Sequence, residues 1–270
     1  MHSDFFDGNT GVNPGSNSGD EIINQADLVR PCHIKGILHS HSNCTDGAHC
    51  LVEMAEIARK IGLEYLGISD HFRSQAHPCG LNMEEVRAQR EEVDRLQEDL
   101  PFLEIFHGVE LDANKDGTLP LDADTLAIFD YTIASFPDTE TLTLSQRTEL
   151  IEKVAAYPQV TILGWPVGDW ILRQDDNLLD MDRILAAAEA GRTAVEVNAN
   201  PTSLPLDWSY CLKAQDMGVK MVISPNAHRA ARLVDFRHGA ELAHDAGLCC
   251  ESFLNTLTSE QLRSYLAGNS

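Results

Sequence analysis

The chain has 270 residues, 43% of them hydrophobic, and its 42 acidic and 20 basic residues give a formal net charge of −22. This length suits one large core or two modest domains. Because nucleic-acid binding draws much of its affinity from phosphate neutralisation by Lys and Arg, an excess of acidic residues argues against a duplex DNA partner. No stretch approaches the roughly 20 consecutive apolar residues of a membrane span, so no membrane partner is expected.

The cysteine pattern and the N-terminus both favour a cytoplasmic protein. The sequence has seven cysteines, an odd count, and no two of them form a Cys-x-x-Cys pair. This pattern fits reduced thiols better than a disulfide framework. The first residues lack the basic region and the apolar segment of a signal peptide, so export is not indicated.

The first thirty residues are predicted to form a flexible N-terminal arm. Asn, Gly, Ser and Asp dominate the stretch 8–20, and no hydrophobic period emerges there. Such a segment has little apolar surface to bury, so it is either mobile or draped across the rest of the protein or a partner. We assign residues 31–268 to one domain. The sequence does not indicate an oligomeric state.

After the arm, short apolar runs alternate with helical patterns. The apolar runs are Ile34–Leu38, Tyr65–Ser69, Leu103–Val109, Tyr131–Ser135, Val160–Leu163, Ala194–Asn198 and Lys220–Ser224. The helical patterns are Leu51–Ile61, Met83–Glu98, Leu144–Ala156, Met181–Ala190, Trp208–Met217, Arg229–Ala246 and Ser259–Leu266. Strands that are each followed by a helix predict an α/β fold with a closed or nearly closed parallel barrel.

The first predicted strand leads into two histidines, His39 and His41, that are one residue apart. Side chains of an extended segment alternate with period two, so both imidazoles project from the same face. Neutral imidazoles on one face are potential metal ligands. An isolated pair of this kind is more often a solvated strand end, so the metal hypothesis depends on further ligands.

Further ligand types stand at other strand ends or in the turns that follow them, namely Asp46, His71, Glu110 and His228. The carboxyl ends of barrel strands face one rim, so these side chains are expected to converge with the histidine pair on a metal cluster. Carboxylates together with imidazoles suit Zn, Mn or Fe. Glu110 and His228 each keep an alternative interpretation as solvated strand ends. The other histidines, including His77 and His107, lack this placement and are interpreted as ordinary surface or core residues.

Several motifs in chain order carry a family resemblance. They are His39-Ser40-His41 with Asp46-Gly47, Ser69-Asp70-His71, Gly108-Val109-Glu110, Asp130 to Ser135, Ile162-Leu163-Gly164, Glu196 to Pro201, Asn226-Ala227-His228 and Phe253 to Leu257. Over nearly all of 34–266 the chain resembles the PHP family (polymerase and histidinol phosphatase domain). It is similar to the PHP module of bacterial family X DNA polymerases and to stand-alone PHP phosphatases. The resemblance implies a distorted seven-stranded β/α (TIM-like) barrel.

The resemblance also implies which residues would hold metal at the rim, where family members bind up to three ions. One ion would take His39, His41, Glu110 and the residue at 226, where the family has an acidic residue and this chain has Asn226. Another ion would take Asp46, His71 and His228, all of which are present. His39, His41 and Glu110 would then be the catalytic set.

The remaining metal position of the family is depleted in this chain. That ion would share Glu110 and take two histidines, where this chain has Pro137 and Trp165. Neither replacement can ligate a metal, and the neutral Asn226 is a poorer ligand than an aspartate for a divalent cation. Asp169 stands near the place of an arginine that the family often uses for phosphate. We therefore expect one or two divalent ions (Zn, Mn or Fe) rather than three.

Two functions follow from a depleted site of this kind. The first is a metal-dependent phosphoesterase of low or altered activity, acting on a small phosphorylated substrate. The second is a non-catalytic PHP fold that keeps metal for structure and serves a binding or regulatory role. The retained ligands favour metal binding, while the loss of the middle ion removes electrostatic stabilisation that can be worth about 10²–10³ in rate. We favour the enzyme by a narrow margin.

Overall fold

Seven strands form one parallel sheet in the computed structural model, which describes residues 27–137, 139, 141–164, 179–201 and 208–268. The strands are β1 (Gly36–Ile37), β2 (Tyr65–Ile68), β3 (Glu104–Asp112), β4 (Tyr131–Ser135), β5 (Ile162–Leu163), β6 (Ala194–Asn198) and β7 (Met221–Ser224). Their order in space follows their order in the chain, and all neighbours are parallel. The predicted β/α barrel is therefore confirmed.

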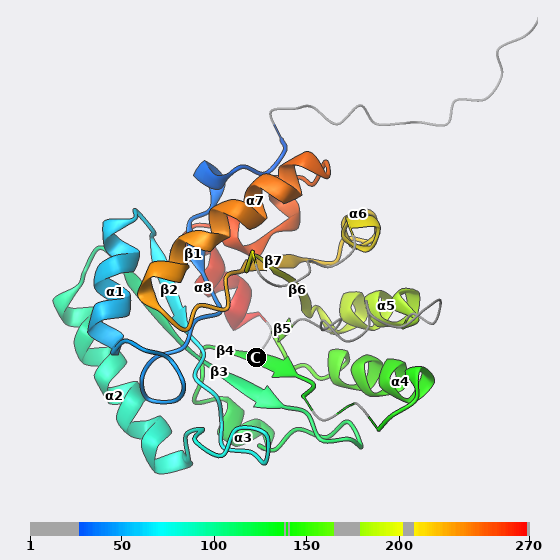
Figure 1. Cartoon of the computed structure of the whole chain (residues 1–270), viewed down its shortest axis with the longest axis horizontal. Coiled ribbons are helices and arrows are strands. Elements are labelled where there is room, and N and C mark those ends of the chain that lie inside the picture. Colours follow the sequence, from blue (N-terminus) through cyan, green and yellow to red (C-terminus); the bar gives the residue numbers. More distant parts are fainter. Residues whose placement is uncertain (1–26, 138, 140, 165–178, 202–207, 269–270) are drawn as a thin grey trace, which may run out of the picture.

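Helices surround the strands (Figure 1). They are α1 (Leu51–Lys60), α2 (Met83–Asp99), α3 (Ala123–Leu126), α4 (Leu144–Ala155), α5 (Met181–Gly191), α6 (Trp208–Asp216), α7 (Phe236–Asp245) and α8 (Ser259–Ala267). Short 3₁₀ helices are η1 (Pro31–His33), η3 (Ala230–Asp235), η4 (Cys250–Ser252) and η5 (Leu254–Thr256). In the described part of the chain, no helix has both the length and the apolar character needed to cross a membrane.

Two predicted elements differ in type or extent from the observed ones, and one short helix was not predicted. The helical pattern 229–246 is η3 followed by α7, and the short helix α3 was not predicted. The third strand continues through Glu110, which the sequence had suggested lies just after it. The reason is a change of partner, because β3 pairs with β2 up to His107 and with β4 from Gly108 onward. Glu110 is consequently held by a strand and is 7% exposed, which removes its interpretation as a solvated strand end.

The apolar side chains divide between the inside of the barrel and the layer beneath the helices. The interior group includes Tyr65, Phe106 and Tyr131 and extends to Leu262 and Leu266 of α8. Helix α8 lies behind the strands in Figure 1, so it covers one end of the barrel interior. Each fully buried side chain of this size contributes about 1.5–3 kcal/mol of burial free energy. A second, larger group packs the strands against the surrounding helices.

The barrel closes between its first and last strands. Just beyond the strand ends, Ser40 and Ala227 form a parallel bridge, with the His41 N–H donating to the Ala227 carbonyl at 3.0 Å. Closer to the other end of the barrel, the Asn255 side chain joins β1 and β7. Its amide donates to the Gly36 carbonyl at 2.9 Å and to the Ile223 carbonyl at 3.1 Å, and its oxygen accepts from the Ile223 N–H at 2.6 Å. One fully buried side chain thus satisfies three backbone groups.

The described part of the predicted arm packs on the barrel. Leu28 forms an antiparallel bridge with Cys249, and the Val29 N–H donates to the Leu248 carbonyl at 2.9 Å. Val29 is fully buried. The rest of the arm, residues 1–26, lies outside the described residues.

Replacing Asn255 by leucine should destabilise the protein by about 3 kcal/mol or more. Leucine keeps the volume but leaves three buried backbone groups without partners, each costing about 1–3 kcal/mol. Urea unfolding of the purified variant would measure this loss. The matched control is Asn43→Leu at an exposed position, which should change stability by no more than about 0.5 kcal/mol. Equal stability of the two variants would contradict the joining role of Asn255.

Candidate metal centre

The closure of the barrel sets the positions of the first two candidate ligands. The Ala227 N–H donates to the His39 carbonyl at 3.3 Å, and the Ser69 N–H donates to the Ser40 carbonyl at 2.9 Å. The backbone from His39 to His41 is therefore held on both sides as an extended segment. Both imidazoles are almost fully buried, with His39 2% and His41 0% exposed. They project toward the rim as the alternation of side chains predicts.

A tight turn returns Asp46 to the same rim. The Gly47 N–H donates to the Ser42 carbonyl at 2.9 Å, so the turn folds back over the histidine segment. A Cβ at Gly47 would lie 2.4 Å from the His41 carbonyl oxygen, so only glycine fits this approach. Glycine is therefore required directly after Asp46 for steric reasons. The close approach that it allows brings the aspartate over His41.

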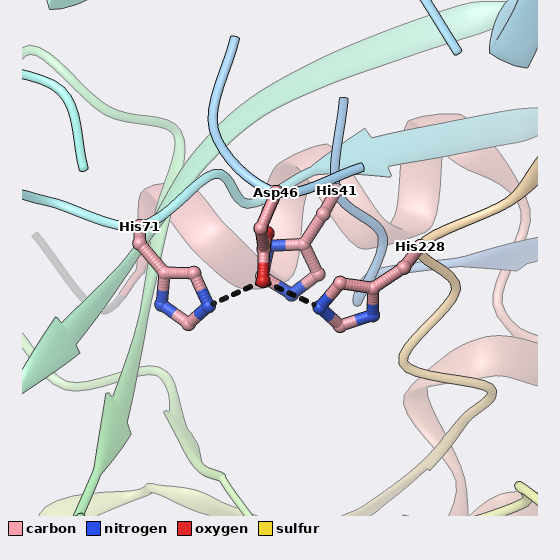
Figure 2. Close-up of side chains that lie close together, drawn as sticks. All are labelled: His41, Asp46, His71 and His228. Atoms are coloured by element: carbon pink, nitrogen blue, oxygen red, sulfur yellow. Dashed lines mark hydrogen bonds and ion pairs between the residues drawn. The ribbon is translucent and has the colours of Figure 1, made fainter. Parts of the chain in front are cut away.

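Four of the predicted residues form one cluster, His41, Asp46, His71 and His228, with one ligand atom of each within 4.8 Å of the others. Figure 2 shows the Asp46 carboxylate between the rings of His71 and His228, with His41 beside it. The Asp46 carboxylate lies 3.0 Å from His228 Nε2 and 3.7 Å from His71 Nε2. The cluster has a buried side formed by His41 and His71 and a half-exposed side formed by Asp46 and His228.

A second cluster shares His41 and adds His39 and Glu110. One oxygen of Glu110 lies 3.1 Å from His39 Nε2, 3.3 Å from His41 Nε2 and 3.4 Å from His71 Nδ1. This carboxylate thus faces three imidazoles at once and connects the two clusters. The structure therefore brings six predicted residues to one rim.

The polar atoms of these clusters fit a bound cation. Both ring nitrogens of His41 and Nδ1 of His71 are buried, yet none of them has a hydrogen-bond partner. A buried polar atom without a partner costs about 1–3 kcal/mol, unless something else satisfies it. Several unpartnered nitrogens next to carboxylate oxygens form the donor set that Zn, Mn or Fe prefers. The residues present therefore suit one or more divalent ions.

The carboxylates and imidazoles also shift one another's pKa. Burial opposes the charged form of His39, but the Glu196 and Glu110 carboxylates outweigh it and raise its pKa to about 10. Burial likewise opposes ionisation of Glu110, yet the contacts with His39 and His41 hold its pKa well below the usual range. Burial lowers the pKa of His71 to about 4, so its ring is neutral near pH 7. His71 is therefore in the form that binds metal, whereas His39 must release a proton first.

Asn226, the residue that replaces the expected acidic ligand, keeps a strained and unsatisfied geometry. Its φ of 44° lies in the left-handed region, which Asn tolerates better than most residues. Its side-chain oxygen is buried and has no hydrogen-bond partner. Pro137, at an expected histidine position, is exposed, while Trp165 and Asp169 lie outside the described residues. Asn226 thus offers a neutral oxygen where the resemblance implies a charged one.

Three residues near the centre were not assigned a role from the sequence. Glu196 of β6 accepts a hydrogen bond from His39 Nδ1 at 2.6 Å and is fully buried. A carboxylate behind a ligating histidine fixes the ring and increases its basicity. The signal in the sequence was an acidic residue in the middle of an apolar strand. His77, which was predicted to be an ordinary surface or core histidine, stacks on His71 with the ring centroids 3.6 Å apart.

Asp70, the third unassigned residue, holds the loop that carries the ligands. Its carboxylate accepts from the Ser42 N–H at 2.8 Å, the Ser42 hydroxyl at 2.5 Å and the Thr45 hydroxyl at 2.5 Å. Gln89 of α2 donates to it at 2.6 Å. The chain places Asp70 directly before His71, so one short segment supplies both a ligand candidate and the anchor of the Asp46 turn.

Comparisons with known proteins identify relatives of this chain. The chain is 33% identical over 255 residues, 93% of its length, to the DNA polymerase/3'-5' exonuclease PolX of Bacillus subtilis, of which it spans 45%. It is 26% identical over 239 residues to a protein named "Probable phosphatase" from Thermoanaerobacter sp., covering 83% of this chain and 91% of that protein. No protein-family model matches the chain.

A solved structure extends the likeness to the fold. Histidinol phosphate phosphatase from Lactococcus lactis, crystallised with zinc, L-histidinol and phosphate, superposes with a TM-score of 0.59 at 18% identity. The match covers 79% of this chain and 94% of that one. The barrel, the motifs at its strand ends and these relatives together assign the chain to the PHP family.

Proposed function

We propose that the protein is a metal-dependent phosphoesterase of the phosphatase type, with a rim that holds one or two divalent ions. The observation that supports this most directly is the two groups of ligand atoms within 4.8 Å that share His41. The phosphatase relatives and the zinc-containing histidinol phosphate phosphatase point to the same class of reaction. A small phosphate ester is the proposed substrate. PolX is more than twice as long as this chain, so its polymerase and exonuclease activities are not carried over.

The side chains of the rim would divide the work between them. Bound divalent ions would supply an activated water and offset charge on the phosphoryl group. His39, His41 and Glu110 are proposed as the catalytic set, because the Glu110 carboxylate faces both imidazoles and connects the two clusters. Glu196 would keep His39 in position. Asp46 and His228 form the more exposed side, where a substrate phosphate would approach.

We further propose that residues 1–30 form an arm, that residues 31–268 form the barrel domain, and that the protein works in the cytoplasm. Burial of Val29 argues that the barrel packing begins slightly before residue 31. None of the seven cysteines, all of which lie in the described part of the chain, forms a disulfide, which supports a reducing compartment.

A non-catalytic role is the second candidate, and one observation favours it. The oxygen offered at the expected acidic position belongs to the neutral Asn226, and Pro137 stands exposed at an expected histidine position. A site depleted in this way would still bind metal and stabilise the rim. The protein would then bind a ligand or partner without turning it over.

The purified protein should contain one or two divalent ions per chain, and not three. Two clusters of ligand atoms are available among the described residues, and Pro137 cannot ligate. Mass spectrometry of protein purified without added metal gives the content directly. Three tightly bound equivalents per chain would contradict the depleted site.

His41→Ala should abolish any phosphatase activity and release metal from both clusters, because His41 belongs to each of them. Turnover of a generic phosphomonoester with Mn or Zn, beside metal content, would measure both effects. His238→Ala on the exposed face of α7 is the matched control and should keep wild-type activity. Turnover that survives His41→Ala would show that the activity comes from another site or a contaminant.

Restoring the expected ligands should raise the rate. The variant Trp165→His, Pro137→His and Asn226→Asp supplies the ligand types that the resemblance implies, with an expected gain of about tenfold or more in kcat. The measurement is the same turnover assay after metal loading. If neither the wild type nor the folded, metal-loaded triple variant hydrolyses any phosphoester, the non-catalytic role becomes the better account.

Binding to double-stranded DNA should be weaker than micromolar at physiological salt. The net charge of −22 leaves few cationic groups to neutralise phosphates. Fluorescence anisotropy with a labelled duplex would measure the affinity. A micromolar or tighter complex at that salt would favour a nucleic-acid substrate instead.

A further inference from the structure

Four imidazoles form a continuous stack through the metal centre. The ring of His41 stacks on His228 with centroids 4.3 Å apart and on His71 at 4.6 Å. His71 in turn stacks on His77 at 3.6 Å, with an interplanar angle of 8°. His71 therefore contacts the rings of both His41 and His77, and its contact with His77 is the closer and more nearly parallel one. His77 ends the stack and belongs to neither cluster of candidate ligands.

His77 is itself held on a braced loop between β2 and α2. The Leu81 N–H donates to the His71 carbonyl at 2.8 Å and the Arg73 N–H donates to the Leu81 carbonyl at 2.9 Å, which returns the loop over His71. Nδ1 of His77 lies 2.8 Å from the Asp112 carboxylate at the end of β3. The Ser74 hydroxyl also donates to Asp112 and accepts from the His77 N–H. Backbone and side chain of His77 are thus both fixed.

His71 lacks the usual device that orients a ligating histidine. Such a histidine normally donates its other ring N–H to a carboxylate or carbonyl, as His39 does to Glu196. Both ring nitrogens of His71 instead face candidate ligand carboxylates at longer range, 3.4 Å to Glu110 and 3.7 Å to Asp46. Its Nδ1 has no hydrogen-bond partner. The closest contact that can orient this ring is therefore the parallel ring of His77.

We propose that His77 is a positioning residue for the metal centre, whose ring, held by Asp112, fixes the plane of His71. The lone pair of an imidazole lies in the ring plane, so a ring that can tilt aims its lone pair poorly. The His77 ring lies nearly parallel to the His71 ring, with centroids 3.6 Å apart, so a tilt of His71 would bring the two rings into collision. This proposal rests on the proposed function, because it takes His71 to be a metal ligand.

Cobalt binding tests this role without relying on turnover. Titration of the full chain with Co²⁺, followed by calorimetry and visible absorption, would compare the wild type with His77→Ala and His77→Phe. His77→Ala removes the flat ring and should weaken Co²⁺ binding about 10–100-fold, with an altered absorption band. His77→Phe keeps a flat ring on His71 and should stay within a few-fold of wild type. His244→Ala, another histidine beside an aspartate, is the matched control and should bind as the wild type does.

The outcomes separate this proposal from the proposed function. A wild type that binds Co²⁺ at a site lost in His41→Ala, together with an unchanged affinity and spectrum in His77→Ala, would overturn the positioning role alone. An equal loss in the alanine and phenylalanine variants would also overturn it, because stacking would then not be the cause. A wild type that takes up no Co²⁺ would overturn the proposed metal centre, and this role with it.

Discussion

The contact between the first and last strands of the barrel is the constraint on which the candidate site depends. It joins the backbone at Ser40 to that at Ala227, so the segments that carry His39, His41 and His228 are fixed relative to one another. A parallel sheet whose ends did not meet would leave these histidines on opposite edges. Asn255 maintains the same closure from deeper in the barrel, because its side chain supplies the hydrogen bonds that a continuous strand pair would make. Stability and site geometry therefore have a common origin.

Within that frame, a small number of carboxylates organises the imidazoles. Glu110 faces three rings, Glu196 fixes His39 from behind, and Asp70 holds the turn that presents Asp46. Each of these carboxylates is either buried itself or contacts a buried partner. A charged group that stays in contact with water could therefore not take its place. A buried carboxylate or imidazole without a partner destabilises the folded protein. A bound cation would pair with these groups, so the groups that cost stability when unpaired are also the ones suited to hold it.

Much of this arrangement was predictable from the sequence, and the remainder was not for identifiable reasons. The alternation of strands and helices, together with ligand types at strand ends, predicted the barrel and the meeting of His39, His41, Asp46, His71, Glu110 and His228. Sequence periodicity could not reveal that β3 changes partner at Gly108, so Glu110 was expected past its strand. The role of His77 depends on how a loop folds back over His71, and no local pattern encodes such a return. Asn255 lies in one of the motifs that carry the resemblance, but its joining role was not predicted because a buried amide looks like any other loop residue in a sequence.

The charge balance of the rim supports the proposal that it holds one or two divalent ions. Among the described residues, Asp46, Glu110 and Glu196 are the carboxylates that contact the clustered imidazoles. Their three negative charges nearly balance the four positive charges of two divalent ions, whereas three ions would bring six. An aspartate at 226 would add a fourth negative charge, and its replacement by Asn226 removes it. The neutral Asn226 and the exposed Pro137 stand where the resemblance implies ligands, and they act in the same direction as this charge balance. The carboxylates of the rim therefore match the one or two ions that we propose better than three.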